Sequence, residues 1–328
     1  MTEPLVKVED LSIEFDVSKR FLNRLLSNEP KSYLKAVKNV SFEINRGESF
    51  SIVGESGCGK STIARLLVGL YKPTSGRIIY DGIDLAMATK AERDMIRRKS
   101  QMIFQDPFAS LNPRWTVERI VAEPLHAFGL VNTASEARKK VAKMLGYVGL
   151  GASDMAKYPH EFSGGQRQRI SIARALAGKP EFLVCDEPTS ALDVSVQAQI
   201  INLMKDLQDE FDLTYLFISH DMSVISHFSD RVGVMYLGNL VESGPVDRIF
   251  DHPQHRYTTM LMDSIPDISQ INRARTPVSG EVPNPINPPS GCPFHPRCNN
   301  VTVACKQSFP TKRTIAKEHI VHCEYQAV

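Results

Sequence analysis

The sequence of 328 residues contains no long hydrophobic run. Its longest apolar stretches, such as residues 66–70, are much shorter than the about 20 residues of a membrane-spanning helix, so we expect no segment to cross a bilayer. The first residues, MTEPLVKVED, also lack a basic region followed by an apolar one. We therefore expect no secretory signal and a cytosolic location.

The chain has no strong excess of charge of either sign. Lys and Arg number 39 against 37 Asp and Glu, a net charge of +2, which gives no reason to expect a nucleic-acid partner. The charge divides unevenly, with +4 from residue 271 onward and −2 before it. Seven of the 20 prolines lie in residues 277–296, a density that excludes helix and predicts an extended connection.

The pattern of apolar residues predicts an α/β protein. Residues 5–15 and 40–44 alternate like half-buried strands, and residues 49–53 lead into a glycine-rich loop before a helical pattern. Residues 116–177 are mainly helical in pattern. Further on, apolar strands at 182–185, 215–218 and 232–236 alternate with helical segments, which is typical of a buried, mostly parallel sheet.

Residues 54–61 read GESGCGKS, a full match to the phosphate-binding motif G-x-x-x-x-G-K-[ST] between a strand and a helix. Its glycines let successive backbone N–H groups point at phosphate oxygens. Lys60 supplies a positive charge for the terminal phosphates, and Ser61 supplies a hydroxyl ligand for Mg²⁺. The predicted ATP-binding loop comprises Gly54, Glu55, Ser56, Gly57, Cys58, Gly59, Lys60, Ser61 and Thr62.

Two acidic residues follow the apolar strand in the segment FLVCDE, residues 182–187. Asp186 is suited to hold Mg²⁺, and Glu187 to accept a proton from an attacking water or to orient that water. Two acids after a strand are also common as a simple helix cap. The glycine-rich loop upstream favours the catalytic interpretation.

The segment SGGQRQRISIARAL, residues 163–176, places a good capping residue and two glycines at a helix start, a second anion-binding position. Here the sequence resembles the ATP-binding cassette (ABC) family, whose signature motif is matched by Ser163, Gly164, Gly165, Gln166 and Arg167. The resemblance implies that two cassettes pack head to tail and share two ATP molecules. The signature segment would then reach the ATP held by the other cassette.

Further family positions match in order along the chain. The resemblance implies that Gln105 senses Mg²⁺ and the γ-phosphate, that Asp193 belongs to the D-loop SALD, and that His220 is the switch histidine. It makes Phe15 the expected partner of the adenine ring, with Tyr33 as the competing aromatic. The implied catalytic residues are thus Lys60, Gln105, Glu187 and His220, and the implied Mg²⁺ ligands are Ser61, Gln105 and Asp186.

Several longer phrases, among them QDPFASLNPR at 105–114 and GCPFHPRC at 291–298, are similar to the ATPase subunits of bacterial dipeptide/oligopeptide importers, of the second type where two ATPase subunits are paired. The resemblance implies a P-loop NTPase ABC cassette with a RecA-like core, an antiparallel β subdomain and an α-helical subdomain. The expected division is an ATP-binding core in residues 1–110 and 179–265, a helical subdomain in 111–178 and a Cys-rich tail in 266–328.

This resemblance also implies partners: a second ABC ATPase subunit, identical or different, two transmembrane permease subunits and, indirectly, an extracytoplasmic solute-binding protein. The location would be peripheral, at the cytoplasmic face of the inner membrane. Peptides are the expected cargo, with nickel, a sugar or glutathione as alternatives. A non-transport cassette ATPase is disfavoured by the single cassette and the missing large basic insertion, and a redox-sensing binding module is the other competing function.

An insertion is expected at residues 16–38, with six Lys or Arg against two acids. Within it Phe21, Leu22, Leu25 and Leu26 share one face of a predicted short helix. We hypothesise that this basic amphipathic helix contacts the membrane surface or the transmembrane partner. Packing on its own domain is the alternative.

Four of the six cysteines lie in the tail, separated by five, six and 17 residues: Cys292, Cys298, Cys305 and Cys323. A segment with so little apolar sequence needs a staple, and four thiolates can hold zinc or an iron-sulfur cluster. The wide spacing favours iron, and the resemblance suggests a 4Fe-4S cluster, with free thiols or disulfides still open. His295, His319 and His322 are possible replacement ligands, but the preferred interpretation is that they are surface residues.

Overall fold

The protein is built around an eight-stranded sheet in a computed structural model that describes residues 3–18, 31–263 and 280–325. Its strand order is β11-β12-β10-β9-β3-β8-β7-β6, with parallel pairing from β9 to β6. The strands are β3 (Ser49–Val53), β6 (Ser100–Ile103), β7 (Phe182–Asp186), β8 (Thr214–Ile218), β9 (Arg231–Tyr236), β10 (Asn239–Pro245), β11 (Arg313–Ala316) and β12 (His319–Val321). β3, β7 and β8 are buried along their whole length, which explains their continuous apolar sequence.

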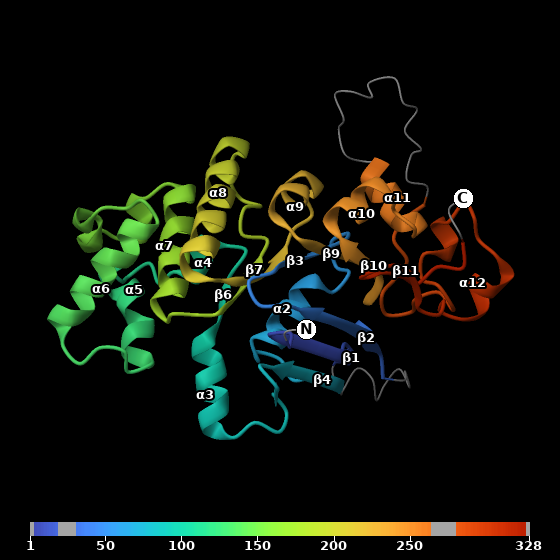
Figure 1. The fold of residues 1–328 in the computed structure, drawn as a ribbon, viewed down its shortest axis with the longest axis horizontal. Helices are drawn as coiled ribbons and strands as arrows, with labels where there is room; N and C mark the ends of the chain where they lie inside the picture. Colours follow the sequence, from blue (N-terminus) through green and yellow to red (C-terminus); the bar gives the residue numbers. More distant parts are fainter. Residues whose placement is uncertain (1–2, 19–30, 264–279, 326–328) are drawn as a thin grey trace.

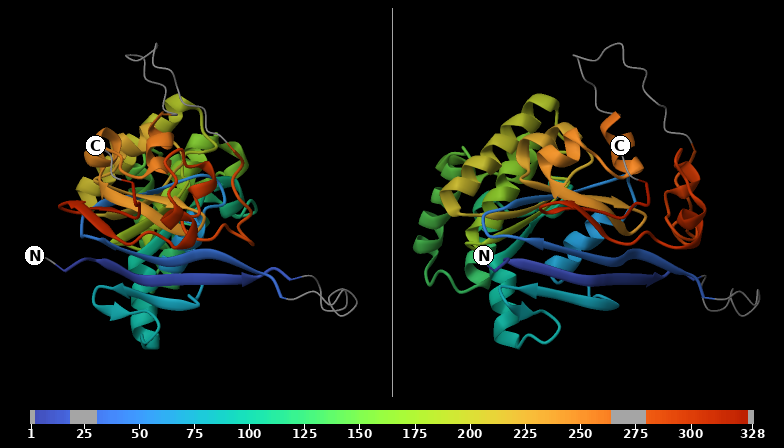
Figure 2. Two further views of the ribbon diagram at one scale, coloured as in Figure 1. Left: turned by 90° about the vertical axis from the view of Figure 1, so that its right-hand side faces the viewer. Right: turned by 45° about the vertical axis from the view of Figure 1, so that its right-hand side comes forward.

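A second, antiparallel sheet of four strands lies below the first (Figure 2). Its strands are β1 (Val6–Asp16), β2 (Tyr33–Ile44), β4 (Ser75–Tyr80) and β5 (Ile83–Asp84). One apolar cluster joins Val6 of this sheet, Phe50 of β3 and Ile63 of helix α2 (Lys60–Leu67). The helix α2 is therefore fixed between the two sheets.

The predicted insertion at 16–38 is partly strand. β1 runs on to Asp16 and β2 begins at Tyr33, because residues 33–37 alternate in burial and Phe15 pairs with Leu34. The predicted amphipathic helix with Phe21, Leu22, Leu25 and Leu26 lies outside the described residues.

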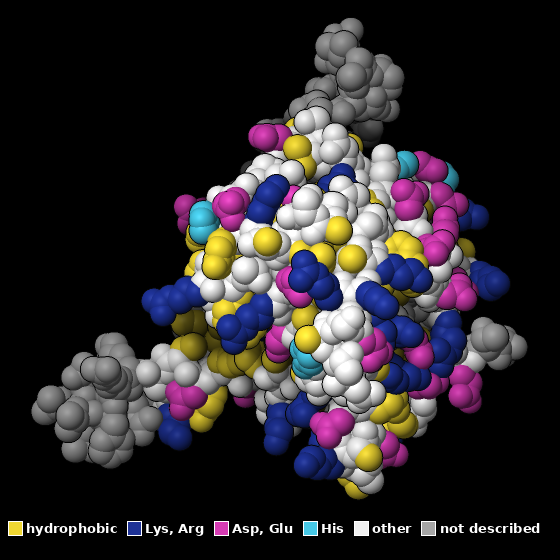
Figure 3. Space-filling view, turned by 90° about the vertical axis from the view of Figure 1, so that its left-hand side faces the viewer, with side chains coloured by type: hydrophobic (Ala, Val, Ile, Leu, Met, Phe, Trp, Pro, Cys, Tyr) yellow, Lys and Arg dark blue, Asp and Glu magenta, His cyan; other side chains and the backbone are white. Residues whose placement is uncertain are grey.

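A group of helices occupies the end of the molecule opposite the C-terminal segment (Figure 1). Its main members are α5 (Val117–Ala127), α6 (Ala134–Tyr147) and α7 (Gly164–Ala177), beside α4 (Pro107–Ser110) and α8 (Val194–Phe211). Thr116, Thr133 and Ser163 cap the first three of these helices with their side chains. Figure 3 shows cations, acids and apolar side chains intermingled on the face of this end.

The remaining helices are α3 (Lys90–Lys99), α9 (Met222–Phe228), α10 (Val246–Asp251), α11 (Arg256–Asp263), α12 (Val303–Gln307) and the 3-10 turns η1 (Ala152–Ala156), η2 (Pro159–Glu161) and η4 (His295–Arg297). Among these described helices, none has both the length and the apolar character needed to cross a bilayer.

The C-terminal segment joins the cassette instead of forming a separate unit. β12 pairs with β10, so the tail extends the edge of the main sheet, and Phe294 is buried against Tyr236 and Tyr257. The tail thus shares a core with the rest of the chain. This explains how a segment with little apolar sequence of its own is held in place.

A buried carboxylate fixes this docking. Glu242 of β10 is 1% exposed and accepts hydrogen bonds from the backbone N–H groups of Gln254 (2.8 Å) and His255 (2.9 Å). Its Oε1 also lies 2.8 Å from Nε2 of His319 in β12. The interpretation of His319 as a surface residue is wrong, because the imidazole is the partner that a buried carboxylate requires.

We predict that Glu242→Ala lowers the free energy of unfolding by at least about 3 kcal/mol, since three donors, two of them on the buried residues His255 and His319, lose their acceptor. Urea denaturation measures the change, and limited proteolysis should show earlier cleavage in residues 280–325. Glu318→Ala, at an exposed carboxylate 3.9 Å from Arg231, is the matched control and should change stability by less than about 0.5 kcal/mol. Equal stability of both variants would contradict the role of Glu242.

Candidate nucleotide site

The glycine-rich loop connects β3 to α2 and presses against two neighbouring strands. Gly54 has φ 150° and Gly59, which begins α2, has φ 109°. A Cβ atom on Gly54 would lie 2.1 Å from the carbonyl oxygen of Met235, and one on Gly59 would lie 2.2 Å from that of Ala36. Both positions therefore require glycine, and the close contacts hold the loop in one conformation.

Lys60 and Ser61 lie at the start of α2 and contact the loop and β7. Lys60 Nζ donates to the carbonyl oxygens of Gly54 (2.7 Å) and Glu55 (3.1 Å), so the cation lies over the loop. Ser61 Oγ donates to Asp186 Oδ1 at 2.8 Å. Burial raises the pKa of Asp186, and the Ser61 hydrogen bond together with nearby cations partly offsets this effect. A cation beside this serine and aspartate would stabilise the charged carboxylate.

Three polar side chains meet where neighbouring parallel strands end. Glu187 follows β7 with φ 46°, and its N–H donates to the carbonyl oxygen of Ile218 at 3.0 Å. Gln105, just after β6, donates from Nε2 to Glu187 Oε2 at 2.9 Å. Nδ1 of His220, just after β8, lies 3.5 Å from the same oxygen. The structure thus brings Gln105, Glu187 and His220 together around one carboxylate oxygen.

A cavity of about 450 Å³ opens beside the loop, a volume suited to a small-molecule ligand. Its lining consists of Phe15, Leu34, Lys35, Ala36, Ser56, Gly57, Gly59, Lys60, Ser61, Thr62, Gln105, Glu187, Leu237, Gly238 and Pro285. Phe15 packs edge-on against Tyr71, with ring centroids 5.5 Å apart, whereas Tyr33 is not among the lining residues. The sequence did not predict that residues of β2, Leu237 and Pro285 line this cavity, since no local pattern marks them.

The signature segment lies apart from this cavity. Ser163 accepts the N–H of Gln166 at 3.3 Å, and Gln166 Oε1 accepts the N–H of Ser163 at 3.0 Å, a complete capping box at the start of α7. Gly165 is buried, and a Cβ there would lie 2.4 Å from Val196 of α8. Ser163, Gly164, Gly165, Gln166 and Asp193 are absent from the described lining of the cavity, so the chain does not bring them to its own loop.

Two family profiles match the chain. Residues 37–190 match the profile described as ABC transporter, and residues 241–305 match the C-terminal region of oligopeptide/dipeptide transporters. The oligopeptide transport ATP-binding protein AppF of Bacillus subtilis (strain 168) is 47% identical over 325 residues, or 98% of this chain and 97% of the relative. The chain belongs to the ABC transporter family. The family expected from the signature motif is confirmed.

Other members of the ABC family are also similar to this chain along most of its length. The dipeptide transport ATP-binding protein DppF of Escherichia coli (strain K12) is 45% identical, covering 94% of this chain and 91% of the relative. Among solved structures, the cassette MJ0796 in a dimeric post-hydrolysis state bound to ADP and Pi superposes with a TM-score of 0.64 at 31% identity, covering 74% of this chain and 98% of that one. The predicted ABC cassette fold is thereby confirmed.

The four tail cysteines of this ABC protein surround one very small cavity, of about 10 Å³. Burial raises the pKa of Cys292 to about 12, and burial likewise raises the pKa values of Cys298 and Cys323. Within the described ranges, no three or more His, Cys, Asp or Glu side chains are arranged to hold a metal ion. The predicted ligands are therefore gathered in one place, but the predicted iron-sulfur or zinc site is not supported.

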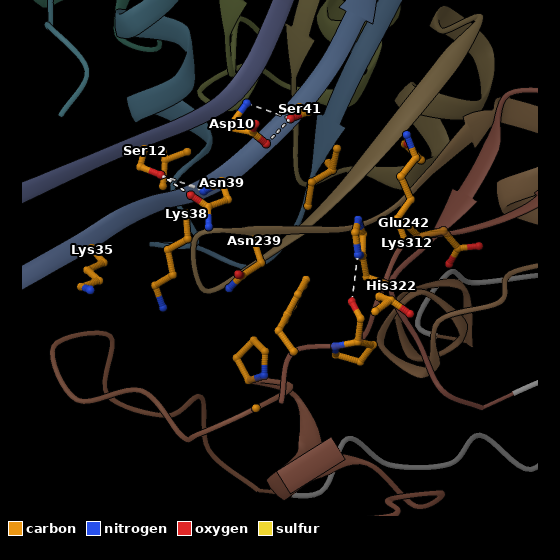
Figure 4. Close-up of a pocket in the computed structure, with 18 of the residues that line it drawn as sticks. Asp10, Ser12, Lys35, Lys38, Asn39, Ser41, Asn239, Glu242, Lys312 and His322 are labelled. Atoms are coloured by element: carbon orange, nitrogen blue, oxygen red, sulfur yellow. Dashed lines mark hydrogen bonds between the residues drawn. The ribbon is translucent and has the colours of Figure 1, made fainter. Parts of the chain in front are cut away.

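A larger cavity, of about 810 Å³, lies between β1, β2, β10 and the tail (Figure 4). Its walls include pairs that bond to each other: Ser12 Oγ donates to Asn39 at 3.0 Å, and Ser41 Oγ donates to Asp10 at 3.2 Å. Burial, aided by the charge of Lys35, lowers the pKa of Lys38. The cavity has charged groups of both signs and no glycine-rich loop, so its chemistry does not favour a nucleotide.

We predict that Gly59→Ala destabilises the protein by at least about 2 kcal/mol, because the new Cβ meets the Ala36 carbonyl at a positive φ. Gly57→Ala is the matched control: its φ is 77°, but nothing lies within 4 Å of the new Cβ, so a cost of about 1 kcal/mol is expected. Urea denaturation compares the two. A smaller effect at Gly59 than at Gly57 would show that the close contact does not matter.

Proposed function

We propose that the protein hydrolyses ATP to energise the import of peptides through partner transmembrane permease subunits. One observation carries the proposal: three groups lie together at one edge of the sheet. They are the glycine-rich loop, the Ser61–Asp186 pair and the Gln105–Glu187–His220 group. The full-length similarity to peptide transport ATP-binding proteins supports peptides as cargo.

The phosphates of ATP would bind to the N–H groups of the loop and to Lys60, at the positive end of α2. The Ser61 hydroxyl and the Asp186 carboxylate, 2.8 Å apart, fit the ligand preference of Mg²⁺, and Gln105 would supply a third ligand. Bound Mg²⁺ neutralises charge on the transferring phosphoryl group. Phe15 would contact the adenine ring from the wall of the cavity.

Glu187 would take the proton of an attacking water. Its carboxylate lines the cavity beside Lys60 and Ser61, and Gln105 and His220 flank its Oε2. The hydrogen bond from Gln105 orients the carboxylate, and the exposed His220 can contact the terminal phosphate. In this assignment Lys60, Gln105, Glu187 and His220 are the catalytic group.

A second cassette would complete the site. The N-terminus of α7, with Ser163, Gly164, Gly165 and Gln166, lies apart from the loop in the same chain and fits the phosphates of an ATP held by a partner. Asp193 is exposed and forms no capping hydrogen bond, and the adjacent Val194 is 84% exposed. Head-to-tail packing, with two ATP between a pair of like or unlike cassettes, would cover these residues.

The proposed division of labour assigns the ATP-binding core to residues 1–110 and 179–265, the helical signature subdomain to residues 111–178 and the tail to residues 266–328. The chain would act at the cytoplasmic face of the inner membrane, with a solute-binding protein as an indirect partner.

We predict that Glu187→Gln lowers ATP turnover at least about 100-fold while ATP binding is retained, because the amide keeps the shape but cannot accept the proton. The measurements are phosphate release and uptake of a labelled di- or tripeptide by the complex reconstituted with its permeases. Lys60→Ala is the comparison variant and should weaken ATP binding itself. Near-normal ATP turnover of Glu187→Gln would contradict the catalytic role of Glu187. Uptake of nickel, a sugar or glutathione in place of the labelled peptide would contradict the proposal that the protein energises peptide import.

We propose further that Cys292, Cys298, Cys305 and Cys323 bind a 4Fe-4S cluster, with zinc as the alternative. The proposal starts from the four cysteines lining one cavity; binding would require this cavity of about 10 Å³ to open and the described side chains to rearrange, since they are not arranged to hold a metal ion. Protein purified without oxygen should absorb near 400 nm and contain iron. Cys298→Ser should lose both signals and Cys58→Ser should keep them. A colourless protein without iron would exclude the cluster, and stoichiometric zinc would favour the alternative.

A further inference from the structure

A buried arginine of the tail is bound to the phosphate-binding loop. The side chain of Arg297, at the end of η4, is 3% exposed. Its Nη1 donates to Glu55 Oε2 at 2.8 Å and its Nη2 donates to Glu55 Oε1 at 3.0 Å. This two-point ion pair joins residues that are 242 positions apart in the chain. It is the geometry in which a guanidinium binds a carboxylate most specifically.

The surroundings hold the guanidinium in this orientation. Nη1 also donates to the hydroxyl of Tyr236 at 3.2 Å, and the guanidinium carbon lies 5.8 Å from the ring centroids of Tyr236 and Phe294. Tyr257 packs against both of these rings, with centroids 4.6 Å and 5.5 Å away. The cation therefore sits in an aromatic cage formed by β9, α11 and the tail, where an unpaired charge would be costly.

Glu55 links this cage to the catalytic lysine. Its backbone N–H donates to the hydroxyl of Tyr257 at 2.8 Å, and its carbonyl oxygen accepts a hydrogen bond from Lys60 Nζ at 3.1 Å. The side chain and the N–H of Glu55 are thus both held from outside the loop, while its carbonyl holds Lys60. Any displacement of Glu55 would move the acceptor of the lysine.

We propose that Arg297 is a positioning residue of the ATP site: through Glu55 it holds the phosphate-binding loop, and with it Lys60, in the conformation that binds ATP. The proposal rests on the proposed function, since it requires that this loop binds ATP. It gives the C-terminal segment a role in the nucleotide site. A lysine cannot replace the arginine fully, because an ammonium group does not form the two parallel hydrogen bonds.

The test is a double-mutant cycle on the full chain, with Arg297→Gln, Glu55→Gln and the double variant. The dissociation constant for a fluorescent ATP analogue should rise about tenfold in each single variant, since a misplaced loop loses phosphate contacts. The double variant should show the same rise, because either change breaks the same pair. KM for ATP should rise more than kcat falls, and Arg297→Lys should lie between wild type and Arg297→Gln.

Arg313→Gln is the matched control, because Arg313 is a tail arginine that donates to the carbonyl oxygen of Tyr325 and does not contact the loop. It should bind the analogue like wild type. Circular dichroism and thermal unfolding identify variants that fail to fold. If Arg297→Gln does not fold, ATP-analogue binding is compared in Glu55→Gln and Arg297→Lys instead. Wild-type affinity in the folded variants, or additive losses in the double variant, would overturn the proposal. A wild-type protein that binds no ATP would instead reject the proposed function.

Discussion

The candidate site depends on the register of the parallel strands β6, β7, β8 and β3. Ile103 pairs with Cys185, Asp186 pairs with Ile218, and Ile52 also pairs with Ile218, so all four strands end at the same level. The residues that follow each strand therefore emerge at one edge of the sheet. A shift of one strand by a single residue would turn its buried side chains to the other face and separate Glu187 from Gln105 and His220.

The second constraint is the way the tail closes on the cassette. Two carboxylates of the cassette, the buried Glu242 and the partly exposed Glu55, each receive a buried basic partner from the C-terminal segment, His319 and Arg297. An uncompensated buried charge is strongly unfavourable, so these pairs specify where the tail docks as well as stabilising it. The same segment carries the four cysteines, which line one small cavity.

Much of the site could be predicted because its residues follow short, ordered motifs. The glycine-rich loop begins directly after β3, Asp186 ends β7, and Glu187, Gln105 and His220 each lie within two residues of a strand end, where an apolar run stops. The boundaries of β1 and β2 were harder, because the aromatic Tyr33 takes an exposed position at the start of β2. The burial of His319 could not be foreseen, since nothing near it in the sequence reveals a carboxylate 77 residues away.

The class of the protein, the phosphate-binding loop and the order of the catalytic candidates follow from the amino-acid sequence alone, because they are encoded by neighbouring residues. The folded chain was needed to show that Phe15, not Tyr33, lines the cavity, that the signature helix lies away from its own loop, and that the tail extends the main sheet. Those outcomes depend on strand register and on ion pairs between distant residues, such as Arg297 with Glu55. Local sequence patterns cannot predict such pairs, because the two partners come together and stabilise the protein only when the chain has folded.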